Sequence, residues 1–265
     1  MSALGARSDP TPPPRYRRRV TSLRLRVLGC GDAFSSGGRL HPCFHLHDGR
    51  HSLLIDCGAS ALAALRREGL DPGSIGWVAI SHLHGDHFGG LPWLLLDGRY
   101  HGRQLPLQIA GPSGLSERVA QAFSAFYPGA AEAQTPFGLS YCELREGQTQ
   151  QLGPALLTPF ATRHESGAPS LALRIELAGR VIAYSGDTEW TDALPALARG
   201  ADLFICECSF YDERVPGHLD YRTLAQKRPL LECRRLLLTH LGEQMLARAH
   251  ELEIPAAHDG MAIEL

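Results

Sequence analysis

The sequence predicts an α/β protein in which β-sheets are covered by helices. Two observations predict this class: strand-like segments dominate the first part of the chain, and helical segments interleave with strands in the remainder. The composition agrees, since 265 residues that are 44% hydrophobic and 20% charged can bury a substantial core. The net charge of −2 excludes a global basic field that would draw the protein to nucleic acid or to an anionic membrane.

The individual elements follow from apolar patterns. Residues 23–28 alternate apolar and polar side chains like a half-buried strand, and residues 43–48 and 51–56 predict a hairpin. A short helix is expected to begin after Ser60, which caps it, and to run through Glu68. The remaining predicted elements are strands at 77–80, 107–110, 155–161, 171–177, 181–185, 203–208 and 235–239, and helices at 88–96, 116–127, 191–199, 221–227 and 244–251.

The N-terminal segment differs from the rest of the chain. Residues 1–20 are rich in proline and arginine, which predicts a disordered basic tail that is solvated rather than bound to nucleic acid. The segment lacks the apolar middle of a signal peptide, and no apolar run approaches transmembrane length. Seven scattered cysteines, an odd number, indicate a reducing compartment. We therefore expect a cytoplasmic protein that does not bind membranes.

The hexapeptide His82-Leu-His84-Gly-Asp86-His87 carries four metal-ligand side chains directly after the predicted strand 77–80. Imidazole nitrogens suit zinc, and a carboxylate extends the choice to manganese or iron. Because residues i and i+2 of an extended segment point the same way, His82 and His84 can bind one ion. Asp86 and His87 follow a turn and face a second position. The segment therefore predicts two adjacent ions.

Three further candidate ligands stand at the ends of predicted strands. His164 closes one strand, Asp187 follows the next but one, and His240 closes the last. Catalytic groups often collect on loops that a rigid sheet holds in place. Each residue alone is weak evidence, but together with the hexapeptide they indicate a two-metal centre.

This set of motifs resembles the metallo-β-lactamase-fold hydrolases over nearly the whole chain from about residue 23. The segments that carry the resemblance are His82-x-His84-x-Asp86-His87, His164, Gly186-Asp187-Thr188 and Leu238-Thr239-His240. The resemblance implies a four-layer αβ/βα sandwich, here residues 21–265, with two divalent metal ions at the sheet edge. It also implies the ligands: His82, His84 and His164 for one metal, Asp86, His87 and His240 for the other, and Asp187 as a bridge.

Other residues place the chain within this family. The segments Leu28-Gly29-Cys30-Gly31-Asp32, Gly85 to Pro92 and Ala110 to Gly114 resemble the ribonuclease Z and cyclic-phosphodiesterase branch. Glu207 and His218 match a glutamate and a histidine of ribonuclease Z, which implies that His218 faces the phosphate and Glu207 orients it. Asp56 resembles the family's early buried aspartate, which orients a ligand rather than binding metal.

One departure concerns the arm with which ribonuclease Z binds tRNA. That arm is often inserted between the third histidine motif and the bridging aspartate. Only 22 residues, 165 to 186, separate His164 from Asp187 here, and they predict two strands and a turn. A small phosphodiester is therefore expected as substrate in place of tRNA, and no nucleic acid partner is expected.

The resulting prediction is a binuclear metal-dependent phosphodiesterase that acts on a small or cyclic phosphodiester through a hydroxide held between the metals. Zinc is the expected metal, with manganese or iron as alternatives. The candidate catalytic residues are His218 as general acid, Glu207, and Asp86 in addition to its place among the ligands. The alternatives are an ester, lactone, thioester or lactam hydrolase on the same scaffold, ribonuclease Z-type tRNA processing, and a non-catalytic binding protein. The resemblance also allows a homodimer.

Some features have two interpretations. Cys206 and Cys208 are either a soft-metal pair or buried thiols, and we expect buried thiols. His45 and His47 are interpreted as a solvated strand face rather than a further metal site. Arg39 either contacts a substrate phosphate or lies in a plain surface loop. Four aromatic residues either line a pocket or pack in the core: Phe34, Phe44, Trp93 and Tyr100.

Overall fold

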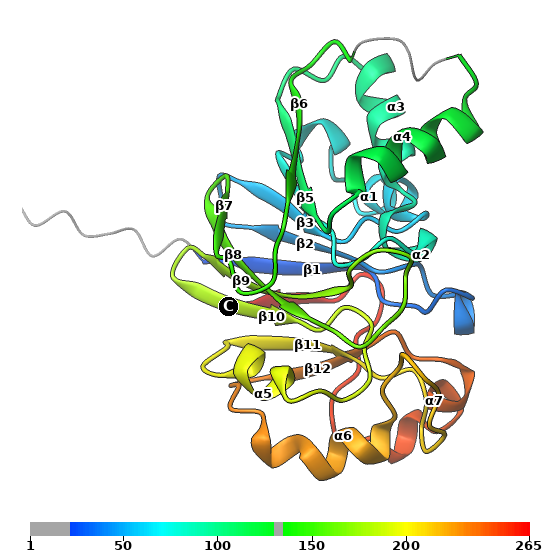
Figure 1. Cartoon of the computed structure of the whole chain (residues 1–265), viewed down its shortest axis with the longest axis vertical. Coiled ribbons are helices and arrows are strands. Elements are labelled where there is room, and N and C mark those ends of the chain that lie inside the picture. The colour runs from blue at the N-terminus through cyan, green and yellow to red at the C-terminus, as the bar shows by residue number, and fades with distance from the viewer. Residues whose placement is uncertain (1–21, 130–134) are drawn as a thin grey trace, which may run out of the picture.

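Two mixed β-sheets pack face to face, and helices cover the outer surface of each sheet (Figure 1). This arrangement comes from a computed structural model that describes residues 22–129 and 135–265. It confirms the predicted four-layer α/β sandwich. The predicted tail, residues 1–20, lies outside the described residues.

The first sheet contains most of the N-terminal strands. Its first three strands in chain order pair antiparallel, and the next pairings are parallel, which requires crossover helices. In spatial order the strands are β13 (Ala262–Glu264), β1 (Arg24–Gly29), β2 (Cys43–His47), β3 (Ser52–Ile55), β4 (Trp77–Ala79), β5 (Leu107–Gly111) and β6 (Leu139–Glu143). The helices on this side of the sandwich are α1 (Ala61–Arg67), α2 (Gly85–Phe88), α3 (Leu91–Tyr100) and α4 (Leu115–Phe126).

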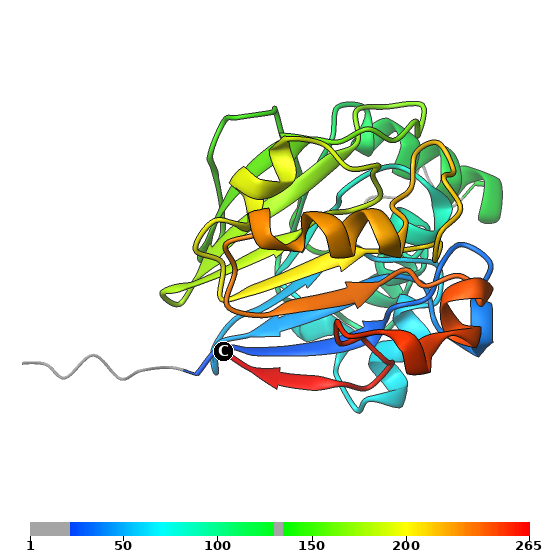
Figure 2. The same cartoon turned by 90° about the horizontal axis from the view of Figure 1, so that it is seen from below.

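The second sheet contains the C-terminal strands. It pairs antiparallel on one side and parallel on the other. In spatial order the strands are β12 (Leu236–Thr239), β11 (Leu203–Glu207), β10 (Arg180–Tyr184), β9 (Leu171–Leu177), β8 (Ala155–Ala161) and β7 (Gln150–Leu152). The helices on this side of the sandwich are α5 (Ala193–Ala198), α6 (Tyr221–Lys227) and α7 (Glu243–Ala247). Helix α6 lies over β11 and β12 (Figure 2). Short 3₁₀ turns lie at Ser36–Gly38, Pro72–Ser74, Arg228–Leu230 and Ala249–Glu251.

Apolar side chains from both sheets form the central core. Strand alternation directs Leu25 and Phe44 of the first sheet and Leu173 and Tyr184 of the second into this layer, where all four are buried. The rings of Phe44 and Tyr184 meet across the interface at a centroid distance of 5.4 Å. Helix packing on the outer face of the first sheet follows the helical period, since α4 buries every fourth residue from Leu115.

The predicted helix at 88–96 is wrong in its extent, because two helices occupy this region. The break falls at Gly89 and Gly90, where the Gly90 amide donates to the Cys57 carbonyl at 2.8 Å. A side chain at Gly90 would collide with the Gly58 carbonyl, so the close approach of these loops requires glycine. Within the described part of the chain, no helix has both the length and the apolar character needed to cross a bilayer.

Candidate metal centre

The predicted ligands meet at one edge of the sandwich, where strands of both sheets end. The segment His82–His87 follows β4 of the first sheet, whereas His164, Asp187 and His240 follow β8, β10 and β12 of the second. His240 and Asp86 are 154 positions apart, yet the His240 Nε2 and Asp86 Oδ2 atoms are separated by 3.3 Å. The fold therefore brings all seven predicted ligands into one cluster.

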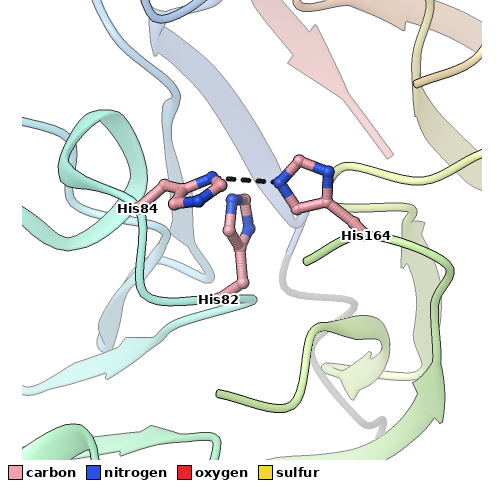
Figure 3. A group of neighbouring side chains, drawn as sticks. All are labelled: His82, His84 and His164. Atoms are coloured by element: carbon pink, nitrogen blue, oxygen red, sulfur yellow. Dashed lines mark hydrogen bonds between the residues drawn. The ribbon is translucent and has the colours of Figure 1, made fainter. Parts of the chain in front are cut away.

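Three histidines form one half of this cluster (Figure 3). His84 Nδ1 and His164 Nε2 lie 3.0 Å apart, and the ring of His82 is 5.0 Å and 4.8 Å from their rings between centroids. The outer nitrogen of His164 is fixed, because Nδ1 donates to the Gly217 carbonyl at 2.8 Å. This bond leaves the Nε2 lone pair facing the other two rings, as a metal ligand requires.

Asp86, His87, Asp187 and His240 form the other half, and all four are buried. Asp86 Oδ2 lies 3.2 Å from His87 Nε2. The Nδ1 atoms of both histidines are fixed by hydrogen bonds. His87 Nδ1 donates to Asp56 Oδ2 at 2.7 Å, and His240 Nδ1 lies 2.9 Å from the hydroxyl of Ser209. Both Nε2 atoms therefore point toward the carboxylates.

Asp187 lies between the two halves. Its Oδ2 atom is 3.8 Å from Nε2 of both His82 and His164 and 3.4 Å from His240 Nε2, whereas Oδ1 is 3.3 Å from His87 Nε2. Ligand atoms on one tetrahedral ion with bonds of about 2.0–2.1 Å are about 3.3–3.4 Å apart. The observed separations are close to this value, and one carboxylate reaches both groups.

Several atoms of the cluster are buried without a hydrogen-bond partner: His82 Nε2, His87 Nε2 and Asp187 Oδ1. Buried polar atoms in native proteins are nearly always paired, and an exception calls for an explanation such as an ion. These nitrogen and carboxylate donors are the types that zinc and related cations bind. The residues present therefore fit a metal centre.

The charges of the cluster also indicate a cation site. Although burial raises the pKa of the Asp187 carboxyl, His240 and His87 lower it well below its usual range. Burial lowers the pKa of His240, but Asp187 and Asp86 raise it to about 9. The buried carboxylates thus favour positive charge beside them, and divalent cations supply such charge.

Strained backbone occurs at two positions of the site. Asp56 has φ of 54° and His240 has φ of 59°, in the left-handed region that non-glycine residues rarely adopt. The Asp56 carboxylate accepts four hydrogen bonds, from the Ser81 amide and hydroxyl, His87 Nδ1 and the Tyr184 hydroxyl. This network places Asp56 in contact with the candidate ligand His87.

Glu207 and His218 lie beside the cluster. His218 Nδ1 is 3.3 Å from Glu207 Oε1, and the buried Glu207 carboxylate also accepts from the hydroxyl of Ser209 at 2.8 Å. Burial lowers the pKa of His218, but the hydrogen bond and the charge of Glu207 raise it above its ordinary value. Ser209 also contacts His240 Nδ1, and neither a motif nor its spacing singled it out.

A second set of contacts fixes the loop that carries His218. Glu189 Oε1 accepts from the Gly217 amide at 3.0 Å, and the Gly217 carbonyl accepts from His164 Nδ1. Gly217 has φ of 85°, and a side chain there would crowd the His164 ring. Glu189 therefore holds the loop in place from the Asp187 side of the site.

The cluster opens into a cavity of about 500 Å³. This size is typical of small-molecule sites. Besides His218 and five of the candidate ligands, the wall includes two aromatic residues, Phe34 and Phe210. Of the aromatic residues considered in the sequence, Phe34 thus lines the pocket, whereas Phe44 belongs to the core and Trp93 stacks on Phe126.

The structure also decides the open interpretations. Cys206 and Cys208 are buried in the apolar layer beneath the C-terminal helices, as expected. The solvated face predicted for His45 is wrong: this side chain is buried, and burial together with the charge of His47 lowers its pKa to about 4. Arg39 donates to the Ala257 carbonyl at 2.7 Å and anchors its loop to the C-terminal segment, away from the cavity wall.

Comparison with known proteins gives the family. The model of the family described as Anti-Pycsar protein Apyc1 matches residues 23–255. The chain belongs to this family. A relative is the Mycobacterium leprae protein ML1173, which is 33% identical over 237 residues that cover 84% of this chain and 78% of that protein.

Solved structures show the same fold as this Apyc1-family chain. The metallo-β-lactamase fold protein YhfI from Bacillus subtilis superposes with a TM-score of 0.74 at 24% identity, covering 92% of this chain and all of that one. The short form of human tRNase Z superposes with a TM-score of 0.73 at 25% identity, covering 91% and 98%. The predicted metallo-β-lactamase-like fold is thereby confirmed.

Proposed function

We propose that this chain is a binuclear metal-dependent phosphodiesterase that hydrolyses a small or cyclic phosphodiester, with a cyclic nucleotide as the first candidate substrate. The observation that carries the proposal is His218, which Glu207 holds beside a two-part metal-ligand cluster on the wall of one cavity. The Apyc1 family supports a cyclic nucleotide as substrate.

The metal ligands are proposed as two sets that share one carboxylate. One cation binds to His82, His84 and His164, the other to Asp86, His87 and His240, and Asp187 reaches both. Zinc is our first choice, and manganese or iron are the alternatives. When bound, two such cations supply Lewis-acid chemistry, since they activate water and neutralise charge on the phosphoryl oxygens.

His218 is proposed as the general acid. Because its Nδ1 atom is turned to Glu207, the Nε2 atom remains to hold a proton for the leaving oxygen. The raised pKa favours the protonated imidazole near neutral pH. Glu207 acts through His218 by fixing its orientation and charge.

The main alternative is hydrolysis of a carbon ester, lactone, thioester or lactam on the same scaffold. The Glu207–His218 pair disfavours it, because acyl hydrolysis does not need a histidine that faces a phosphate. Processing of tRNA is also disfavoured, because residues 165–186 form a loop and the hairpin β9–β10 in place of a protruding arm.

The test combines metal content with hydrolysis. We expect two metals per chain by mass spectrometry, and chelator-sensitive cleavage of bis(p-nitrophenyl) phosphate and of 3′,5′-cyclic nucleotides. His218→Ala keeps both metals and loses turnover, whereas His250→Ala, at an exposed histidine outside the cavity, behaves like the wild type. Two metals with cleavage of esters or lactones alone would favour the alternative, and a metal-free protein with full activity would exclude both.

A further inference from the structure

Phe34 is an exposed aromatic side chain on the wall of the metal-site cavity. It is 89% exposed, more than the other large hydrophobic side chains that the structure describes as exposed. A phenyl ring left in water at the mouth of a functional cavity is a surface that a ligand or a partner is expected to cover.

The loop that carries Phe34 is held tightly. The buried Asp32 carboxylate accepts hydrogen bonds from the Phe34 amide at 3.2 Å, the Ser36 amide at 2.9 Å and the Ser36 hydroxyl at 2.7 Å. Ser35, between them, is in the left-handed conformation with φ of 55°. The backbone that carries the ring is therefore held in place, so a ligand that stacks on Phe34 costs little loop entropy.

Two hydroxyl groups of the cavity wall are engaged within the protein. The Ser36 hydroxyl bonds Asp32, and the Ser209 hydroxyl is shared by Glu207 and a metal-site histidine. A second aromatic residue, Phe210, lines the same cavity with its ring 6.1 Å from that of His218. The cavity thus combines metal donors and a proton donor with aromatic surface, which suits a substrate that has a phosphate and a planar ring.

We propose that Phe34 is a specificity-determining residue that stacks on the nucleobase of the substrate while the phosphodiester lies at the metal-ligand cluster. This inference rests on the proposed phosphodiesterase function and adds the binding surface for the base. A second copy of this chain could cover Phe34 instead, and sedimentation distinguishes the two cases.

The experiment compares Phe34→Ala and Phe34→Trp with the wild type on two substrates, a 3′,5′-cyclic nucleotide and the base-free methyl riboside 3′,5′-cyclic phosphate. Base–aromatic stacking of about 1–3 kcal/mol predicts that Phe34→Ala raises KM for the nucleotide about 5- to 150-fold, with kcat nearly unchanged. The base-free substrate is cleaved as by the wild type, and Phe34→Trp restores the nucleotide KM. The matched control is Tyr100→Ala, at an aromatic residue that is 75% exposed and lies outside the cavity wall.

A second readout does not depend on turnover. We expect the Kd of 5′-AMP for the metal-loaded protein, measured by calorimetry, to rise in Phe34→Ala by the same ratio, with metal content and Tm unchanged. If the wild type cleaves no phosphodiester but this shift occurs, the proposed function fails and the base-binding role stands. Equal nucleotide KM and Kd in both proteins, or no nucleotide binding by the wild type, would overturn the inference. A variant that only changes from dimer to monomer in sedimentation would instead assign Phe34 to a subunit contact.

Discussion

Replacing Asp56 with asparagine is expected to move the proton on His87 from one ring nitrogen to the other. In the wild type Asp56 Oδ1 accepts from the Ser81 amide at 2.7 Å, and Oδ2 accepts from His87 Nδ1 at 2.7 Å. The backbone donor cannot reverse its role, so the oxygen of an asparagine side chain stays with Ser81. The amide NH₂ then faces His87 Nδ1, which must become an acceptor.

This change affects His87 Nε2, the atom that is proposed to bind a metal. With its proton on Nε2, His87 presents an N–H to Asp86 and Asp187 and no longer offers a lone pair to a cation. Loss of such an orienting partner typically lowers metal affinity about 10- to 100-fold, which corresponds to about 1.4–2.7 kcal/mol. The fold should persist, because asparagine has the shape of aspartate and either the Ser81 or the Tyr184 hydroxyl can rotate to accept the second amide hydrogen.

The assay is a competition titration of the metal-free protein with zinc and a chromophoric chelator. We expect two binding steps in the wild type and one weakened step in Asp56→Asn. Tyr184→Phe is the matched control, since it removes another bond to Asp56 but leaves the aspartate that fixes the His87 tautomer. Two unchanged zinc steps in Asp56→Asn would refute this account of Asp56.

Four further outcomes are expected. His218→Ala lowers kcat about 10²- to 10⁴-fold with both metals retained, measured by steady-state kinetics and metal analysis. Burial lowers the pKa of His218, but Glu207 raises it above its ordinary value, so Glu207→Gln removes this upward effect and moves the alkaline limb of the kcat–pH profile to lower pH. Glu189→Ala frees the loop that carries His218 and reduces kcat about tenfold, whereas Glu189→Gln, which keeps an accepting oxygen, stays near the wild type; equal losses in both would contradict a positioning role. Chelation of two metals, each present at 100 times its Kd, removes about 5.4 kcal/mol of stability, which lowers Tm by about 10–20 °C in calorimetry.

The sequence predicts the elements whose pattern is strong. The strands at 155–161 and 171–177 and the helix at 221–227 have the predicted bounds, because buried runs or clear caps mark their ends. The short strands at 139–143, 150–152 and 262–264 were not predicted. Each is short or partly exposed and depends on pairing with a distant partner, which a local pattern does not reveal.

The site shows the same division. The proposed ligands are recognisable because their motifs are dense and stand at strand ends, although their assignment stays a prediction. Ser209 and Gly217 were missed, since a serine hydroxyl and a backbone carbonyl carry no signal until the loop around them is placed. The role of Arg39 was left open and the exposure of His45 was predicted wrongly for the opposite reason. Their chemistry is visible in the sequence, but their burial and partners are not.

The arrangement of the ligands indicates what sets the distances within the site. His87 lies in α2, which follows β4 of the first sheet, and Asp187 follows β10 of the second, so the geometry of the centre depends on how the sheets pack. That packing rests on the apolar core, and it continues to the site through Tyr184, which packs on Phe44 and donates to Asp56 at 2.7 Å. Because these contacts do not involve the cluster's free donor atoms, the metal-free protein is expected to keep its fold and to present a largely preformed site. Cations then add stability by neutralising the buried carboxylates rather than by assembling the two sheets.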